Sequence, residues 1–201
     1  MLDRQATALI KPLVQAGAGL LLRAGLRADQ VTLAAFAVGL LAALSISQQH
    51  YLLGLALILL SRLGDALDGA LARLTAATDR GGFLDIALDF LFYASIPLAF
   101  AYADPARNAL AGAALLAAFV GTMSSFLAFA VLAAKRNISN LAYPDKSFYF
   151  LGGLTEATET LAFFIAMCLW PQHFARLAYV FATLCAVTTT TRIWWGWRSF
   201  S

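Results

Sequence analysis

The sequence predicts an all-α integral membrane protein, with six transmembrane helices preceded by an interfacial amphipathic helix and with both termini on the cytoplasmic side. Three observations lead to this fold class: the composition, the length of the apolar runs and the placement of the cationic residues. Of the 201 residues, 61% are hydrophobic and 12% are charged. A soluble domain carries about 25% charged residues, so this chain lacks the polar side chains to cover a globule in water. The composition therefore excludes a soluble or disordered protein.

The first segment, Leu2–Leu22, has an apolar side but is interrupted by Arg4, Lys11 and Pro12. Such a segment is typical of a helix that lies along the membrane interface. No short apolar region with a small-residue cleavage site follows it, so no removable signal peptide is predicted. We assign residues 1–30 to an interfacial or juxtamembrane helix and residues 31–201 to the six-helix transmembrane domain that carries the candidate site.

Long apolar runs separated by short polar breaks make up the rest of the chain. Unpaired backbone amides are too costly in hydrocarbon, so each run is expected to be a helix of about 20 residues. The six spans are predicted at Val31–Ser47, Tyr51–Arg73, Phe83–Ala103, Asn108–Ala134, Tyr149–Trp170 and Phe174–Gly196. The two cysteines, Cys168 and Cys185, lie inside apolar runs and are interpreted as packing residues.

The cationic residues predict the orientation. Arg107 and Arg176 lie in one set of connections, and Arg62 lies inside a span. The other eleven Lys and Arg residues fall in the alternate connections and the termini: Arg4, Lys11, Arg23, Arg27, Arg73, Arg80, Lys135, Arg136, Lys146, Arg192 and Arg198. Lys and Arg in short loops are retained on the cytoplasmic side, so both termini are expected there.

Four aspartates stand out at the cytoplasmic ends of the second and third spans. Asp65 and Asp68 are three residues apart, and Asp85 and Asp89 are four apart, so each pair shares one helix face. An unpaired carboxylate in a membrane helix costs about 2.5–3.5 kcal/mol. The short link Arg73–Gly82 makes the two helices antiparallel neighbours, so both pairs can point into one cavity.

Like charges this close repel, and two ways of neutralising them stay open. In the first, Arg62, Arg73 and Arg80 pair with the carboxylates as an ion network at the membrane surface. In the second, divalent cations bind, because hard ions such as Mg²⁺ prefer sites made of oxygen ligands. Two such ions can clamp a phosphoryl group during displacement. Gly69 and Ala72 keep the same helix face bare, and this favours a phosphorylated ligand beside it.

The runs Asp65-Ala-Leu-Asp68-Gly69-Ala-Leu-Ala72-Arg73 and Gly81-Gly-Phe-Leu-Asp85-Ile-Ala-Leu-Asp89 resemble a family signature. The pattern D-x-x-D-G-x-x-A-R … G-x-x-x-D-x-x-x-D is that of the CDP-alcohol phosphotransferases, also called CDP-alcohol phosphatidyltransferases, and all eight fixed positions are present in order. The chain departs from the family in the link between the two halves, where the seven residues 74–80 are fewer than usual. Six spans after an interfacial helix are also the layout of the short bacterial members.

The resemblance implies an activity and a set of site residues. Family members transfer a phosphatidyl or other phosphoalcohol group from a CDP-alcohol, such as CDP-diacylglycerol, to an alcohol acceptor and release CMP, in phospholipid synthesis. The implied metal ligands for two Mg²⁺ or Mn²⁺ ions are Asp65, Asp68, Asp85 and Asp89. Asp89 is either a ligand or the catalytic base that takes the acceptor proton. The implied CDP-binding residues are Gly69, Ala72, Arg73 and Gly81, although Arg73 is equally well interpreted as a partner of Asp68.

By resemblance we also expect a homodimer in the inner (cytoplasmic) membrane, in contact with membrane lipid, with its active site at the cytoplasmic face and with no nucleic-acid partner. Lys146 and Arg192 lie on that face beside polar residues and are interpreted as an acceptor-phosphate subsite. The acceptor is accordingly expected to be phosphorylated, of the glycerol 3-phosphate or inositol phosphate type. Glu156 and Glu159 lie in the fifth predicted span, where an ion pair or an interhelical hydrogen bond is favoured over contact with acceptor hydroxyls.

The alternative is a small membrane transporter or ion pathway that uses the same intramembrane carboxylates. A pathway needs polar residues through the whole membrane, whereas here they crowd near one face and the outer halves of the spans are apolar. The acidic motif also has no inverted repeat in the second half of the chain, in contrast to many transporters. Both observations favour the enzyme.

Overall fold

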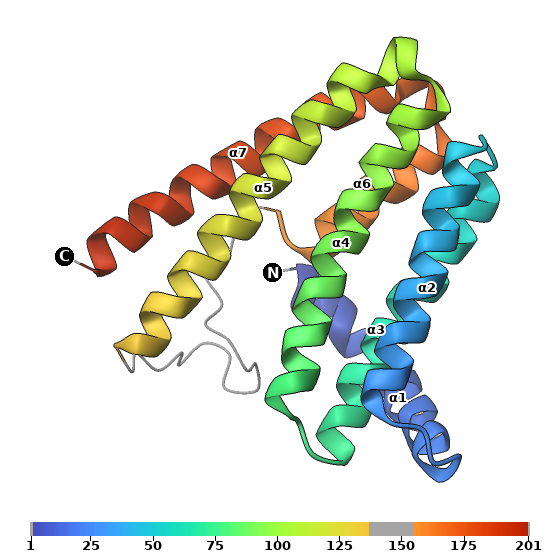
Figure 1. The fold of residues 1–201 in the computed structure, drawn as a ribbon, viewed down its shortest axis with the longest axis vertical. Helices are drawn as coiled ribbons and strands as arrows, with labels where there is room; N and C mark the ends of the chain where they lie inside the picture. The colour runs from blue at the N-terminus through green and yellow to red at the C-terminus, as the bar shows by residue number, and fades with distance from the viewer. Residues whose placement is uncertain (1, 137–154, 201) are drawn as a thin grey trace.

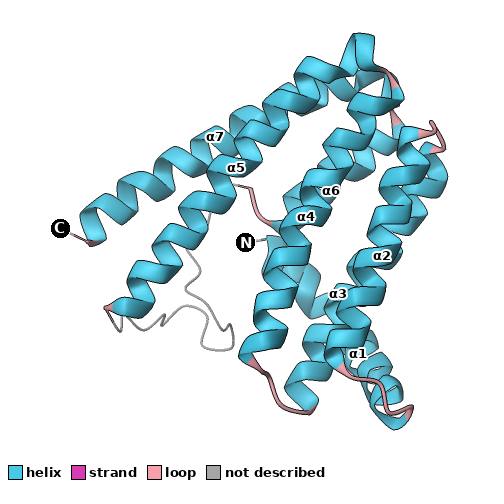
Figure 2. Cartoon of the chain, in the orientation of Figure 1, coloured by secondary structure: helices cyan, strands magenta, loops and turns pink. Residues whose placement is uncertain are grey.

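The fold is known from a computed structural model that describes residues 2–136 and 155–200, with side chains from residue 11 onward. All regular elements in these ranges are helical (Figures 1 and 2). They are α1 (Leu2–Arg23), α2 (Ala28–Ser47), α3 (Tyr51–Leu74), α4 (Asp79–Ala103), α5 (Pro105–Lys135), α6 (Ala157–Leu169), the short 3₁₀-helix η1 (Pro171–His173) and α7 (Phe174–Ser199). The all-helical class predicted from the sequence is confirmed for these residues.

Four helical stretches are long and apolar enough to cross a membrane: α2, α4, α5 and the continuous run Pro171–Ser199. Helix α3 has 24 residues, but its C-terminal half carries Arg62, Asp65, Asp68 and Arg73. Helix α6 has 13 residues and begins at Ala157. The first part of the predicted fifth span, from Tyr149, lies outside the described residues, so six spans remain a prediction.

Helix α1 packs beside the C-terminal end of α3. Val14 and Ala18 are buried against Ala70 and Leu71 of α3, while Leu13 on the other side of α1 is exposed. Figure 1 shows α1, the α1–α2 link and the α3–α4 link at the same end of the molecule. This arrangement agrees with an amphipathic helix at a membrane interface.

Aromatic side chains from several helices fill the core. Phe100 of α4 stacks on Phe174 at 4.5 Å between ring centroids, and Phe119 of α5 meets Phe181 of α7 edge to face at 5.7 Å. Leucines on the outer faces are exposed, among them Leu40, Leu52, Leu91 and Leu110. Apolar side chains on the outer faces of the helices are expected of a bundle solvated by lipid.

Small residues bring α2 and α3 into close contact. A Cβ at Gly64 would lie 2.7 Å from the Cβ of Ala35, and one at Gly54 would lie 2.5 Å from Ile46. At the same interface the hydroxyl of Ser61 donates a hydrogen bond to the carbonyl oxygen of Ala35 at 2.8 Å. Small residues at such crossings let backbones approach in membrane bundles. The contact therefore fixes the middle of α3, next to the C-terminal half that carries its charged residues.

The link between α3 and α4 is shorter than the sequence predicted. The third span was expected to begin at Phe83, but α4 begins at Asp79 because Thr78 caps it: the hydroxyl of Thr78 accepts a hydrogen bond from the Gly81 amide at 3.1 Å. Only residues 75–78 join the two helices. Both aspartate pairs are therefore held on regular helices rather than on a loop.

Candidate active site

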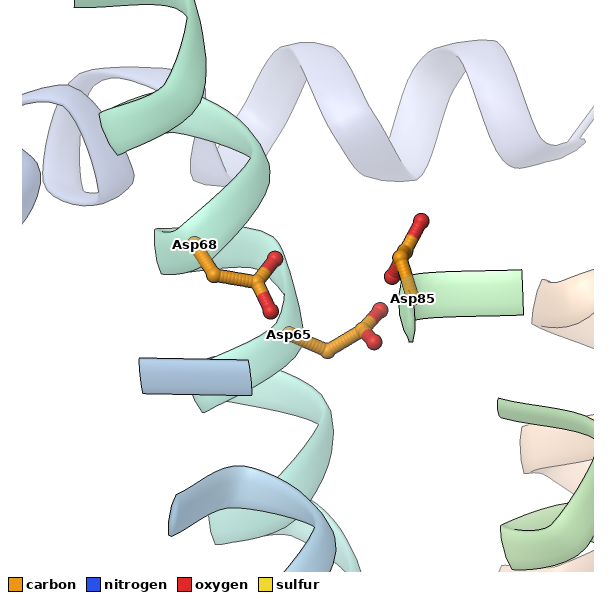
Figure 3. A group of neighbouring side chains, drawn as sticks. All are labelled: Asp65, Asp68 and Asp85. Atoms are coloured by element: carbon orange, nitrogen blue, oxygen red, sulfur yellow. The ribbon is translucent and has the colours of Figure 1, made fainter. Parts of the chain in front are cut away.

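Three aspartates from two helices converge near the link between α3 and α4. Asp65 and Asp68 project from α3 and Asp85 projects from α4, and their side chains point toward one another (Figure 3). One carboxylate oxygen from each lies within 4.8 Å of the other two. Asp68 is buried and Asp85 is exposed, so the cluster opens to one side. An all-oxygen donor set of this kind matches the preference of Mg²⁺ and Mn²⁺.

Asp89, the fourth predicted ligand, lies one helical turn beyond Asp85 but outside this three-carboxylate cluster. Its carboxylate accepts a short hydrogen bond from Nη1 of Arg62, the cation that lies inside α3. The same Nη1 is 3.7 Å from Oδ1 of Asp65. Arg62 therefore stands between a member of the cluster and Asp89.

The arginine network that the sequence left open forms only in part. Arg80 pairs with Asp29 at the start of α2, away from the cluster. Arg73 is exposed, and within the described residues it makes no ion pair with Asp68. Among the three candidate arginines, Arg62 alone neutralises the aspartates here, and one cation cannot balance four carboxylates.

The predicted nucleotide-binding residues differ in how open they are. A Cβ at Gly69 would meet only the guanidinium of Arg73, at 3.5 Å, so this face of α3 is uncovered. Gly81 is more enclosed, since a Cβ there would lie 3.2 Å from both Asp29 Oδ1 and Thr78 Oγ1. The open face is on α3, next to the exposed side of the cluster.

Two cavities meet at Asp89. The smaller, of ≈ 10 Å³, holds about one water molecule and is lined by Thr32, Ala35, Phe36, Arg62, Asp65, Asp85, Leu88 and Asp89. The larger, of ≈ 210 Å³, is lined by Asp89, Phe90, Tyr93, Phe119, Thr122, Met123, Phe126, Thr155, Glu156, Ala157, Thr160, Cys185 and Arg192. Asp89 is thus placed to face both.

Arg192 is the buried cation of the larger cavity. It is 8% exposed, and its Nη1 donates a hydrogen bond to the carbonyl oxygen of Thr122 at 3.1 Å. Its Nε finds no hydrogen-bond partner within the described residues. A buried guanidinium with a free donor is costly without a ligand. Arg192 was predicted as a site residue, whereas Lys146 lies outside the described residues.

The two glutamates of the fifth predicted span lie at the start of α6. Glu156 is the N-cap of α6, and its amide donates to the carboxylate of Glu159 at 3.0 Å. They therefore form a capping box at the start of this helix, and the ion pair or interhelical hydrogen bond expected of them stays a prediction. Thr155, just before them, donates its hydroxyl to Thr188 of α7 at 2.9 Å and so ties this start to α7. Cys168 and Cys185 are free and buried, which confirms their interpretation as packing residues.

The fold and the site thus define a helical membrane protein with a carboxylate cluster suited to divalent cations. A family model described as CDP-alcohol phosphatidyltransferase matches residues 26–195. The chain therefore belongs to the CDP-alcohol phosphatidyltransferase family, a family of membrane transferases of phospholipid biosynthesis, as its aspartate signature indicated.

Known proteins resemble the chain over nearly its full length. It is 54% identical over 197 residues to the Inner membrane protein YnjF of Escherichia coli (strain K12). The aligned region covers 98% of this chain and 96% of that protein. Two crystal structures of Mycobacterium tuberculosis phosphatidylinositol phosphate synthase (PgsA1) resemble the fold with a TM-score of 0.70 and 21% identity. One structure holds CDP-DAG, and its match covers 92% of this chain and 94% of the synthase chain. The other holds manganese and citrate, and its match covers 92% of this chain and 88% of the synthase chain. At this identity the likeness shows a shared fold.

Proposed function

We propose that the protein transfers a phosphatidyl or other phosphoalcohol group from CDP-diacylglycerol, or a similar CDP-alcohol, to an alcohol acceptor and releases CMP. The observation that carries this proposal is the convergence of Asp65, Asp68 and Asp85 within 4.8 Å on adjoining helices, in the order of the family signature. The solved relative that holds CDP-DAG supports the choice of donor.

The donor atoms of the cluster fit two divalent ions, Mg²⁺ or Mn²⁺. Asp65, Asp68 and Asp85 would hold them, and Asp89 is either a further ligand or the general base. When bound, the ions would screen the diphosphate and stabilise the negative charge that builds on CMP. The solved relative with manganese supports this choice of metal.

The chain's own residues would position the reactants on either side of Asp89. Gly69, Ala72 and Arg73 would line the CDP site on the open face of α3, together with Gly81 at the start of α4. The acceptor oxygen attacks the phosphorus that bears the diacylglycerol, the bond from that phosphorus to the CMP oxygen breaks, and the acceptor proton passes to Asp89. Carboxylates fixed on helices need little rearrangement before this step.

The acceptor is proposed to bind in the larger cavity. Its wall offers the buried guanidinium of Arg192, and Asp89 stands at its boundary with the cluster. A buried cation with a free donor suits an anionic group, so a phosphorylated acceptor of the glycerol 3-phosphate or inositol phosphate type is proposed, with Lys146 as a second contact.

The membrane arrangement is proposed on similar grounds. Six spans with both termini in the cytoplasm would place the cluster at the cytoplasmic face of the inner membrane, and a homodimer is proposed as the assembly. The α1–α2 link, which contains Arg27, and the α3–α4 link lie at one end of the molecule, which supports this orientation (Figure 1). Arg23, Arg73 and Arg80 lie in the helix ends that flank these links. The inner-membrane relative supports the compartment.

The proposal is tested by supplying purified protein with CDP-diacylglycerol, Mg²⁺ and a panel of acceptors and measuring CMP. We expect release with one acceptor class, and none from Asp68→Ala or Asp89→Asn. Asp104→Asn, at the opposite end of α4, is the matched control and should keep wild-type turnover. A transporter would release no CMP, and turnover retained in Asp68→Ala would contradict the site.

A further inference from the structure

A largely buried arginine shares the small cavity with three carboxylates. Arg62 lines this cavity together with Asp65, Asp85 and Asp89, and its side chain is 13% exposed. Its Nη1 donates a short hydrogen bond to Oδ1 of Asp89 and lies 3.7 Å from Oδ1 of Asp65. The metal and substrate sites proposed above give this cation no role, although it lies among their carboxylates.

The Nη1 atom of Arg62 competes directly with a divalent ion. A Mg²⁺ ion that joined Asp65 Oδ1 to Asp89 Oδ1 would have to lie about 2.1 Å from each oxygen. Both oxygens already face Nη1, and the cavity beside them, of ≈ 10 Å³, has room for about one water molecule. The guanidinium and a divalent ion therefore cannot share this position.

The packing around the guanidinium keeps it there. Its central carbon lies 3.9 Å from the ring centroid of Phe92 and 5.5 Å from that of Tyr93. Phe92 is fully buried against α2, where a Cβ at Gly39 would lie 2.5 Å from its ring. Nη2 donates to the hydroxyl of Ser61 at 3.4 Å, and this hydroxyl is itself hydrogen-bonded to α2. The guanidinium cannot leave the carboxylates without losing these contacts.

The charges at the site also favour one divalent ion over two. One divalent ion together with Arg62 leaves the four aspartates with one net negative charge, whereas two ions together with Arg62 would leave a net positive charge. Like charges at a partly buried site repel strongly. The position among Asp65, Asp68 and Asp85 has no printed arginine contact except the 3.7 Å approach to Asp65, so it is the one open to an ion.

We propose that Arg62 is a built-in cation of this site, which fills the position between Asp65 and Asp89, so that the substrate-free protein binds one divalent ion and not two. This inference rests on the proposed function, which makes the carboxylates a metal site. The second of the two proposed ions then enters with the diphosphate of the CDP donor, which brings the negative charge to hold it.

Counting the Mn²⁺ bound to purified, substrate-free protein tests the proposal, by equilibrium dialysis and by EPR spectroscopy. We expect one ion per chain in the wild type and two in Arg62→Met, where ions about 4 Å apart give a spin-coupled spectrum. The first ion should bind Arg62→Met about tenfold or more tightly, because the like charge beside it is gone. Arg62→Lys keeps the cation and should bind one ion.

Arg107→Met is the matched control, because Arg107 forms an i,i+3 pair with Asp104 at the other end of α4, as Arg62 does with Asp65. It should bind one ion with wild-type affinity, and Asp68→Ala should lose the ion. Two ions in the substrate-free wild type would overturn the proposal, and this count needs no variant to fold. A single ion in Arg62→Met, bound no more tightly than in the wild type, would overturn it as well.

Thermal unfolding gives a second readout that does not depend on turnover. The rise in Tm on adding Mn²⁺ should be larger in Arg62→Met than in the wild type, and it should be absent in Asp68→Ala. Equal rises in Arg62→Met and the wild type would count against Arg62 as a competing cation. If the expected ion counts are found but no acceptor gives CMP, the proposed function alone is wrong. If CMP is released but the substrate-free wild type binds two ions, this inference alone is wrong.

Discussion

The two cavities that meet at Asp89 differ in charge, size and origin. On one side, the small cavity is lined by Arg62 and by the carboxylates of Asp65, Asp85 and Asp89, and it lies beside the three-carboxylate cluster. On the other, a cavity of ≈ 210 Å³ is lined mainly by aromatic and hydroxyl side chains around the buried cation Arg192. The first suits metal ions, and the second is the proposed acceptor site. Variants on the two sides should therefore alter different kinetic parameters.

The largest effect is expected in the cluster. Asp85→Asn removes one anionic ligand, and we expect kcat/KM to fall by about 10³-fold or more, since a metal ion contributes several kcal/mol to such transition states. The Mn²⁺-induced rise in Tm should also shrink. Initial rates of CMP release and a Tm titration with Mn²⁺ measure both. A loss of activity with an unchanged response to Mn²⁺ would remove Asp85 from the metal site.

In the larger cavity, Arg192→Met should weaken the binding of the acceptor alone. Losing a hydrogen bond from a charged donor costs about 1.5–3 kcal/mol, so the KM for the acceptor should rise about 10- to 100-fold. The KM for the CDP donor should not change. Arg198→Met, an exposed arginine one and a half turns further along α7, is the control. Equal effects on both substrates would erase the distinction between the two cavities.

The packing behind Arg62 depends on Gly39, because the Arg62 guanidinium carbon lies 3.9 Å from the ring centroid of Phe92. Gly39→Ala places a Cβ against the buried Phe92 ring, and overpacking of this kind destabilises by about 1–3 kcal/mol. The Tm should fall, and kcat should fall with it because Phe92 supports Arg62. Gly19→Ala, where nothing lies within 4 Å of the added Cβ, should lower neither. A Gly39→Ala protein with wild-type Tm and kcat would show that the Phe92 ring can shift without cost.

The smallest effect belongs to the surface pair of Arg80 and Asp29. The Arg80 side chain is 81% exposed, so the pair should contribute at most about 1 kcal/mol and less at high salt. Arg80→Met should lower Tm slightly at low salt and change CMP release by less than about twofold. A loss of CMP release comparable to that of Asp85→Asn would mean that the site extends to the start of α2.

The three-carboxylate cluster could be predicted from the sequence far more completely than the larger cavity. Asp65, Asp68 and Asp85 lie on two consecutive helices with a short link, so helical spacing alone brings them together. The larger cavity draws on α4, α5, α7 and the start of α6, and no periodicity within one helix says which faces will meet. Arg192 was predicted, but Tyr93, Thr155 and Thr160 were not.

Two local features were also beyond the sequence. Three arginines lie near the aspartates in the sequence, and the sequence does not favour any one of them as the ion-pair partner. In the structure, the stacking of Arg62 on Phe92 holds Arg62 beside the aspartates. Helix α4 begins at Asp79 rather than at Phe83 because a threonine cap extends it through Gly81 and Gly82, which composition alone assigned to the link. Glycine lowers helix propensity, and the cap outweighs it here.

The most direct measurement is the metal dependence of CMP release by the purified protein with CDP-diacylglycerol and its acceptor. Protein treated with EDTA should release no CMP, Mg²⁺ or Mn²⁺ should restore the rate, and Asp68→Ala should stay inactive at any concentration of either ion. Full turnover in EDTA, or restoration of Asp68→Ala to the wild-type rate, would contradict a reaction carried by the three-carboxylate cluster.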